Sequence, residues 1–507
     1  LISGSGLNIG SELPSDSVLY ESQYLPNFYF YDINGKFTYL PTKKDIISIS
    51  FYEGKDYLGE KKNFDFPLDS IGVDQVMTNE KTRWGNNGVS GRWLHRWTEQ
   101  VTSQLFLSDT KYLSNHLLNS YWSLDTSTTP VYLSQDKNQI IDQTFRVHIT
   151  YNARQNHLIE VGLAKTFYKT DYSVDLGDSI IFINEKIKGN LIEGYVQDRW
   201  VVSSNIELLI GVRSEKFSKG NEIFFDPRFT AFYHLSNQFS LKVSGSRAHQ
   251  FLNRFSNDVI TNGSKFVWLI PNKYMEPMSS IQKNFGFEYD TPDIFFGFDL
   301  YNKTVNNISD FSQLVFPIDV YSESSNNLIF QGTGQSNGFE LFFHKKNGKL
   351  KGWASYNYGT IQCKFPELNG GEVFLADHDR THELKSALIS SLGKWTLSIT
   401  GLISSGRVFT PNNNLMIREN ENANYTLQAE PGTRNSKRLP IVQRIDLSLN
   451  RSMYFMEKSL DIGISIFNVF DRNNISHRSY NLFVDPFITT DVIMLGFTPT
   501  VSIQLGF

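Results

Sequence analysis

The last eight residues of the chain alternate strictly between apolar and small or polar side chains, and the chain stops on an aromatic residue. In an extended strand, one face would carry Val501, Ile503, Leu505 and Phe507, and the other Thr500, Ser502, Gln504 and Gly506. An edge strand of a soluble sandwich accounts for the alternation but not for the terminal Phe. A transmembrane β-barrel accounts for both, because one face of each strand meets lipid and the other meets a polar lumen.

The composition favours the barrel. The 507 residues include 40 Phe, 24 Tyr and 8 Trp, yet hydrophobic residues make up only 40% and the mean hydropathy is −0.31. A helical membrane protein needs apolar runs of about 20 residues, and the sequence has none. Alternating strands with aromatic girdles at the two membrane interfaces combine many aromatic residues with low mean hydropathy.

Charge and motifs exclude several functions. A net charge of −4 argues against nucleic acid as a partner. The single Cys363 excludes an internal disulfide framework and a cysteine-based metal site. No Gly-rich phosphate loop precedes a helix, and no spacing specifies a hydrolase nucleophile beside a His, so we expect no enzyme activity and no catalytic residues. No signal peptide opens the chain, so we expect the numbering to begin inside a larger precursor.

The chain repeats one unit, made of a strand, a very short turn, a second strand and a long polar loop. Turn-forming residues mark the short connections, for example Asp290-Thr291-Pro292-Asp293. Long connections rich in Asn, Ser, Asp, Gly and Pro are expected near 57–82, 172–188, 251–280, 306–333, 363–380, 407–438 and 470–490. This alternation is typical of outer-membrane barrels, with turns in the periplasm and loops outside.

The pattern predicts an all-β fold, an antiparallel transmembrane β-barrel domain over residues 1–507. About 19 strands are expected, near 29–40, 45–56, 87–99, 102–122, 139–152, 157–171, 190–202, 205–217, 226–235, 238–250, 281–290, 293–305, 334–345, 349–362, 381–390, 394–406, 439–451, 457–468 and 491–507. The first and the last both run toward the periplasm. Bacterial barrels have even strand numbers, so an odd number of strands should precede residue 29. About three would make 22, the number in plugged outer-membrane transporters.

Several segments resemble TonB-dependent outer-membrane receptors. They occur in order over nearly the whole chain, at Tyr29–Lys36, Tyr195–Trp200, Gly211–Arg213, Asp226–Phe229, Asn337–Leu341, Ile466–Asp471 and Leu495–Pro499. The resemblance implies a location in the bacterial outer membrane and energised import of a scarce solute, such as a siderophore, haem, cobalamin, glycan or peptide. It also implies an N-terminal plug and a motif that engages the TonB-type inner-membrane complex. Neither is in this sequence, and we expect both, with the first three strands, upstream of Leu1.

The resemblance implies several partners and no cofactor. The partners are outer-membrane lipid, the TonB-type complex, the barrel assembly machinery and a surface lipoprotein. Terminal strands that end in Phe are similar to the signal read by that machinery, so Val501, Ile503, Leu505 and Phe507 form a candidate assembly signal. Two other readings stay open: a plugless porin or structural barrel subunit of an outer-membrane complex, and a soluble secreted β-rich binding protein.

Candidate ligand-binding residues lie where a strand meets a loop or the polar lumen. Arg247 and His249 end a strand at the extracellular rim, and they face a ligand only if they lie beyond the lipid, because they share the parity of apolar Val243. A solvated loop root is the alternative. Glu340, Arg444 and Asp446 lie on polar strand faces and are candidates for the lumen wall. Specificity should reside in the loops 251–280, 306–333 and 407–438, because a rigid barrel leaves variation to its loops.

Two further clusters of polar residues are explained more simply by a structural role than by ligand binding. The segment 377–383, with two His and three carboxylates, could bind a divalent ion, but its place at a strand entry favours a hydrogen-bonding role. No metal site is assigned. The basic and aromatic residues at 92–97 fit an interfacial girdle with a lumen-facing side. Asp198 does not fit the pattern, because it shares the apolar face of Trp200.

Overall fold

The computed structural model describes residues 22–65, 75–124, 127–154, 156–176, 180–256, 266–272, 275–311, 329–419, 425–455, 458–481 and 488–505. Nearly all of them lie in β-strands, and one short 3-10 helix spans Asn369–Gly371. Among these residues, no helix is long and apolar enough to cross a membrane.

One antiparallel sheet forms most of the molecule. Its strands are β1 (Ser22–Thr42), β2 (Asp45–Asp65), β3 (Gln75–Arg96), β4 (Val101–Leu124), β5 (Ser127–Ala153), β6 (His157–Leu176), β7 (Ile180–Ser203), β8 (Ile206–Phe217), β9 (Ile223–His234), β10 (Phe239–Gln250), β13 (Met278–Asp290), β14 (Ile294–Phe311), β15 (Ile329–Lys345), β16 (Leu350–Lys364), β17 (Phe374–Leu375), β18 (His382–Leu392), β19 (Trp395–Ser404), β24 (Val442–Phe455), β25 (Lys458–Phe467) and β28 (Thr498–Leu505). Apart from the two-residue β17, these match the 19 expected strands in number and order.

Short hairpins outside this sheet fill several of the long connections. They pair β11 (Asn253–Ser256) with β12 (Phe266–Leu269), β20 (Val408–Phe409) with β23 (Lys437–Arg438), β21 (Asn412–Glu419) with β22 (Tyr425–Pro431), and β26 (Ile475–Asn481) with β27 (Ile488–Ile493). The last expected strand, 491–507, is therefore shorter in the structure. Its first residues belong to β27, and β28 begins at Thr498.

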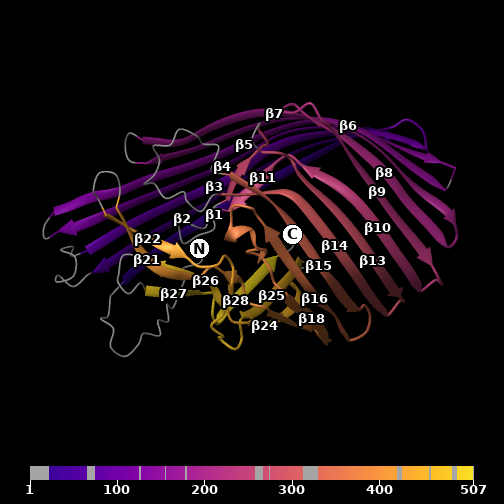
Figure 1. Ribbon diagram of the computed structural model, residues 1–507. Helices are drawn as coiled ribbons and strands as arrows, with labels where there is room; N and C mark the ends of the chain where they lie inside the picture. Colours follow the sequence, from indigo (N-terminus) through magenta and orange to yellow (C-terminus); the bar gives the residue numbers. More distant parts are fainter. Residues whose placement is uncertain are drawn as a thin grey trace.

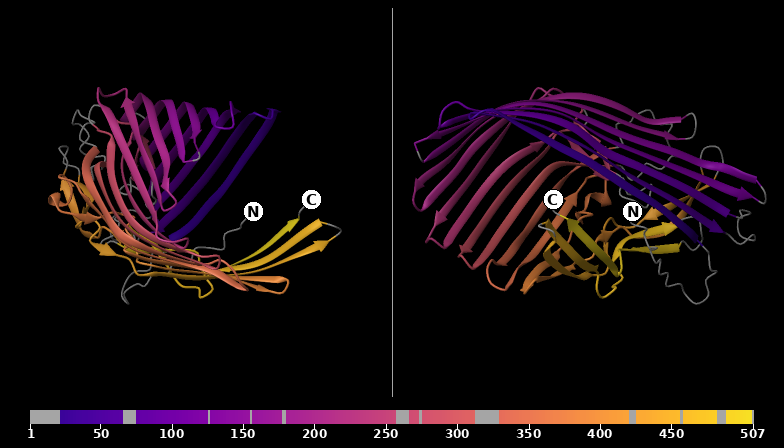
Figure 2. Two further views of the ribbon diagram at one scale, coloured as in Figure 1. Left: turned by 90° about the vertical axis from the view of Figure 1, so that its right-hand side faces the viewer. Right: turned by 180° about the vertical axis from the view of Figure 1, so that it is seen from behind.

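Each long strand of the sheet pairs with its neighbour in sequence, which makes an up-and-down meander. The sheet curves into an incomplete barrel, with β1 at one edge and β28 at the other (Figure 1 and Figure 2). Within the described residues, β1 pairs with β2, β28 pairs with β25, and no pairing joins β1 to β28. The expectation that further strands close the barrel is consistent with these two edges and stays a prediction.

The two faces of the sheet differ as the alternation predicts. Large apolar side chains are exposed on one face, among them Ile210, Val212, Phe225, Phe229 and Val243 of the adjacent strands β8, β9 and β10. Charged side chains of the same strands lie on the opposite face. A soluble protein buries such apolar residues, whereas a barrel in a membrane turns them to lipid. We call the two faces the outer face and the lumen face.

Several predicted loops are shorter than expected because the strands continue. The segment 57–82 was expected as a loop, but β2 runs to Asp65 and β3 begins at Gln75, with continuous pairing between them. Likewise β6 runs to Leu176 and β7 begins at Ile180. Beyond the membrane both faces of a strand meet water, so a paired strand there needs no apolar alternation and has a polar sequence.

The described residues between β10 and β13, at 251–256, 266–272 and 275–277, which we call the inward segment, fold inward and build an apolar core. Val267, Leu269 and Met275 are buried against Tyr172 and Val174 of β6. Ile270 is buried in a second cluster, with Phe217, Phe251 and residues of β7. Figure 1 shows β11 on the concave side of the sheet, under the arch of β5 to β7. This segment therefore lies inside the extracellular mouth of the barrel rather than in solvent.

Candidate functional site

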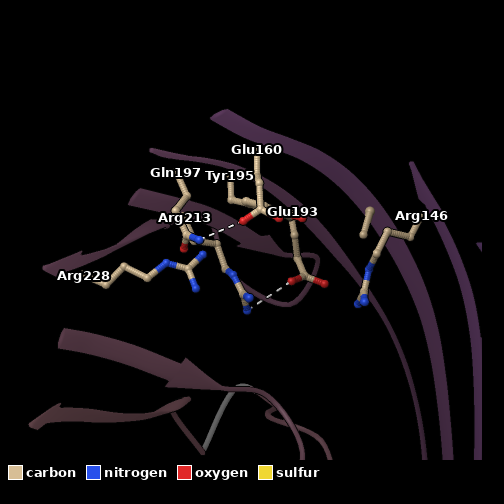
Figure 3. A pocket seen from close by; sticks show the side chains of 8 residues that line it. Arg146, Glu160, Glu193, Tyr195, Gln197, Arg213 and Arg228 are labelled. Carbon is tan, nitrogen blue, oxygen red and sulfur yellow. Dashed lines mark hydrogen bonds and ion pairs between the residues drawn. The ribbon is translucent and has the colours of Figure 1, made fainter. Parts of the chain in front are cut away.

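A polar pocket opens on the lumen face of β5 to β9 (Figure 3). Its volume is about 200 Å³, and its lining residues come from five adjacent strands: Arg146, Glu160, Ala164, Glu193, Tyr195, Gln197, Arg213 and Arg228. Alternation brings them together, because every second residue of a strand points to the lumen and the antiparallel register aligns the charged positions of neighbouring strands. For example, Glu193 and Arg213 are diagonal neighbours across the β7–β8 ladder. Gly194 pairs with Ser214, and each charged residue comes one position before its member of this pair.

Tyr195 forms the aromatic part of the pocket and is held on both sides. Its hydroxyl lies 2.6 Å from His148 Nδ1. Its ring lies over Gly162 of β6, the residue directly opposite in the ladder, and a Cβ added at Gly162 would collide with that ring. The guanidinium of Arg228 also lies over the ring, 5.8 Å from its centroid. The glycine thus provides the space in which the ring lies flat on the wall.

The charges of the pocket are only partly compensated. Arg213 Nη1 lies 3.4 Å from a carboxylate oxygen of Glu193, and Gln197 donates a hydrogen bond of 2.9 Å to Glu160 (Figure 3). Within the described residues, Arg146 and Arg228 form no ion pair, and Arg228 Nε is buried without a hydrogen-bond partner. The pocket therefore presents two guanidinium groups and a phenol that can bind an anionic or polyhydroxylated solute.

The structure places Arg247 and His249 differently from each other. Arg247 is exposed at the rim. His249 should share the outer face of Val243, but its ring contacts Phe224 and Asp226, which lie on the lumen face. The expected parity of His249 is therefore wrong. The β9–β10 ladder ends at the pair Ser246 and Arg228, whereas β10 stays paired with β13 as far as Gln250.

The three predicted wall residues lie on the lumen face, in two separate places. Glu340 of β15 pairs across the ladder with Asp299 and lies on the face opposite Phe339. Arg444 and Asp446 of β24 bind each other, with Nε and Oδ2 3.1 Å apart, and Asp446 also accepts the backbone N–H of Asn468 at 2.9 Å. None of the three lines the pocket of β5 to β9. Their role in ligand binding stays a prediction.

The segment 377–383 ties loops to the barrel, as its place at a strand entry predicted. Asp379 is fully buried and accepts hydrogen bonds from Arg438 Nη2 at 2.7 Å and from the backbone N–H of Ile361 at 2.9 Å. Asp377 accepts a hydrogen bond of 2.6 Å from Asn435. Burial, together with the nearby Arg407, lowers the pKa of Arg380 in the same loop. These carboxylates are satisfied by side chains and backbone of the chain itself.

The misfit of Asp198 has a local explanation. His157 at the start of β6 places Nδ1 2.7 Å from the carboxylate of Asp198, and its ring stacks on Trp200 at 5.5 Å between centroids. The group lies beside the short turn after β7, at the interface where aromatic girdles occur. His157 thus gives one oxygen of the Asp198 carboxylate a hydrogen-bond partner on the outer face.

The candidate assembly signal lies at the free edge of the sheet. Val501 and Ile503 are each 68% exposed, and they pair with Ile464 and Ile462 of β25. Leu505 pairs with Leu460. Phe507 lies outside the described residues, and the signal itself stays a prediction.

No sequence pattern singles out the pocket, although several of its residues lie in the segments that resemble TonB-dependent receptors. Tyr195, Gln197, Arg213 and Arg228 are in three of those segments. The sequence does show a charged or aromatic residue on the polar face of several consecutive strands. These residues can be recognised as one site only when the register between the strands is known.

Comparisons with known proteins agree with this architecture. The family model described as TonB dependent receptor-like, beta-barrel matches residues 10–469. No curated protein matches the chain. Similar solved structures include FpvA of Pseudomonas aeruginosa bound to heterologous pyoverdines, with 10% identity, a TM-score of 0.57, and coverage of 96% of this chain and 71% of FpvA. BauA, the ferric preacinetobactin receptor of Acinetobacter baumannii, has 10% identity, a TM-score of 0.54, and coverage of 96% and 81%. The outer-membrane transporter YddB of Escherichia coli has 10% identity, a TM-score of 0.58, and coverage of 96% and 76%.

Proposed function

The chain belongs to the family of TonB-dependent receptor-like β-barrels, and from this premise we propose that its cargo is an anionic ferric chelate. Members of this family are outer-membrane receptors and transporters rather than enzymes, and their transport is energised through TonB. Family membership does not specify the chemical class of the transported solute.

The pocket of β5 to β9 is the observation that carries the proposal. Two of its guanidinium groups, on Arg146 and Arg228, have no carboxylate partner within the described residues, and Tyr195 adds a flat aromatic surface. Arginine binds carboxylate, hydroxamate or catecholate oxygens through paired, charge-assisted hydrogen bonds. Neutral glycans would need fewer positive charges and more exposed aromatic platforms. Two of the similar structures agree with this class, FpvA in complex with an iron pyoverdine and BauA, the ferric preacinetobactin receptor.

We also propose that the loops and the lumen wall have different roles in binding the solute. The loops at 251–280, 306–333 and 407–438 select the solute at the extracellular mouth, and the pocket binds it on its way through the lumen. Passage would be gated by a plug that precedes this sequence, with the TonB-type complex as the energising partner. The barrel assembly machinery and a surface lipoprotein complete the proposed partners.

Substituting Arg228 tests the cargo class. In the full receptor, Arg228→Gln should weaken binding of the ferric chelate that supports growth by about tenfold or more, because one charge-assisted hydrogen bond contributes about 1.5–3 kcal/mol. The chelate is identified first, by growth of an otherwise receptor-deficient strain on a panel of ferric siderophores, ferric citrate, cobalamin and glycans. Binding is then measured with radioactive iron on whole cells.

Arg199→Gln is the matched control. Arg199 lies on the same face of β7, but Glu207 binds its guanidinium at two points, 2.6 and 2.9 Å, so it is not available to a solute. Its substitution should leave binding unchanged. Growth only on cobalamin or a glycan would refute the cargo class, and equal effects of the two substitutions would refute the role of the pocket.

A further inference from the structure

A second cluster of polar side chains joins the extracellular ends of β8, β9 and β10. It consists of Glu215, Asp226 and His249, whose donor atoms all lie within 4.8 Å of one another. The three side chains are almost completely buried, with exposed fractions of 3%, 7% and 3%. His249 Nδ1 is 2.6 Å from Asp226 Oδ1, and the backbone N–H of His249 donates to Asp226 Oδ2 at 2.9 Å. The cluster is distinct from the pocket, whose lining residues it does not include.

The cluster contains two carboxylates, and the guanidinium that pairs with one of them, that of Arg213, is shared with Glu193. Two buried carboxylates so close together need a cation or a proton, because burial and mutual repulsion both oppose their ionised forms. Arg213 approaches Glu215 Oε1 only at 3.4 Å and lies equally far from Glu193. Glu215 Oε2 is buried and accepts no hydrogen bond within the described residues. Arg247 points its guanidinium to the other side of the imidazole, 3.4 Å from His249 Nε2.

The backbone is shaped to bring the imidazole to the carboxylates. Regular alternation would turn His249 to the outer face. Instead the β9–β10 ladder stops at Ser246 and Arg228, and the carboxylate of Asp226 takes over as the acceptor for the His249 N–H.

We propose that Glu215, Asp226 and His249 bind a divalent transition-metal ion, with zinc as the best fit. One imidazole nitrogen with two carboxylate oxygens is a donor set used for zinc, whereas calcium and magnesium prefer oxygen donors alone. Binding with bonds of about 2.0–2.2 Å would draw the donor atoms, which now lie within 4.8 Å of one another, around a shared ion. The ion would replace the proton between His249 and Asp226 and would give Glu215 Oε2 its missing partner. Three donors leave a coordination position for water.

The place of the site gives the ion a structural role. Two residues beyond His249, Phe251 packs on Phe217 and Phe224 with ring centroids 5.3 and 5.6 Å away. This contact begins the segment that folds into the barrel mouth. An ion that joins β8, β9 and β10 would fix the start of that segment to the wall.

Metal analysis of the full receptor tests the proposal. Receptor purified in detergent, stripped with chelator, loaded with Zn²⁺ and desalted should retain zinc stoichiometrically by mass spectrometry. Competition with a chromophoric chelator should show that Glu215→Gln and His249→Gln each weaken zinc binding by about 100-fold or more. Co²⁺ should give a visible spectrum in the wild type that both variants lose. Glu215→Gln is the milder variant, because Oε2 accepts no hydrogen bond that the amide would break.

His157→Gln is the control. His157 also bonds an aspartate, Asp198, at 2.7 Å, and no third ligand completes a group there within the described residues. This variant should bind zinc as the wild type does. Zinc that is absent from the wild type would show that a shared proton alone holds the two carboxylates. Zinc that is retained equally by Glu215→Gln and His249→Gln would place the ion elsewhere. Either result overturns the proposal.

Discussion

At the scale of single residues, small side chains decide where large ones can lie. Gly162 has no Cβ, and the ring of Tyr195 occupies the space where one would be. A glycine within a strand weakens it and often marks close approach of another group. Here the approaching group is a lumen-facing aromatic ring that contributes to a solute pocket. The glycine that weakens the strand is therefore also the residue that makes room for the ring in the pocket.

Gly162→Ala should therefore displace Tyr195. The ring would have to leave its position over β6 and break its contact with His148, at a cost of about 1–3 kcal/mol for overpacking. We expect a lower thermal midpoint in detergent and weaker binding of the cargo. Gly91→Ala is the control, because a Cβ at Gly91 meets no atom within 4 Å. Identical melting of the two variants would show that the ring yields without cost.

At the scale of elements, the inward segment is attached to the wall by side chains as well as by apolar packing. Asn138 of β5 is almost completely buried and acts as a strand partner for Trp268 of β12. Its amide donates to the Trp268 carbonyl at 3.1 Å, and its carbonyl accepts the Trp268 N–H at 2.9 Å. Both backbone groups of Trp268 are thereby hydrogen-bonded to the barrel wall, while β12 itself pairs with β11.

Asn138→Ala should loosen this segment without unfolding the barrel. Two hydrogen bonds of about 1 kcal/mol each are lost, so the amides of residues 266–272 should exchange with deuterium roughly tenfold faster or more. Asn302→Ala is the control, since Asn302 binds Asn337 on β14 and β15, away from this segment. Unchanged exchange in Asn138→Ala would mean that Ile270 and its apolar neighbours hold the segment alone.

At the scale of the whole molecule, the loops are tied to the barrel by buried charges, which determines how they can be removed. A deletion of 407–438 would take away Arg438 and leave Asp379 buried without its ion pair, a change that costs about 3–5 kcal/mol. Replacing only residues 412–431, which hold the β21–β22 hairpin, by a short Gly-Ser linker spares Arg434, Asn435 and Arg438.

This shorter deletion should reduce cargo binding while the amount of folded receptor in the outer membrane stays normal. Binding to whole cells and heat-modifiable migration on gels measure the two quantities. The full deletion of 407–438 should instead lower both. Normal uptake after removal of this hairpin and of the two other predicted specificity loops would show that the loops do not select the solute.

Removal of Phe507 tests assembly rather than binding. If the terminal strand is the signal for the assembly machinery, the truncated receptor should reach the outer membrane in smaller amounts, and the fraction that folds should bind its cargo with normal affinity. Quantitative blots of outer-membrane fractions, paired with the binding assay, separate the two effects. Normal levels of the truncated receptor would show that Val501, Ile503 and Leu505 suffice.

The sequence by itself determined the elements and their faces. Alternation with a period of two is a local property, so the 19 long strands, the outer and lumen faces and the short turns could be predicted from residues such as Leu460, Ile462, Ile464 and Ile466. The same reasoning placed Glu340, Arg444 and Asp446 on the lumen face. Alternation could not predict strands at residues 57–65 and 75–82, because these paired strands have water on both faces and show no apolar pattern.

Only the tertiary structure decided which residues meet. The pocket needs the register of five strands, and the cluster of Glu215, Asp226 and His249 needs the meeting of three strands that no local pattern reveals. The inward fold of the segment around Ile270 depends on apolar partners about 80 to 100 positions earlier in the chain. Such contacts are set by the free energy of packing across the barrel mouth, which is a property of the assembled wall and not of any one strand.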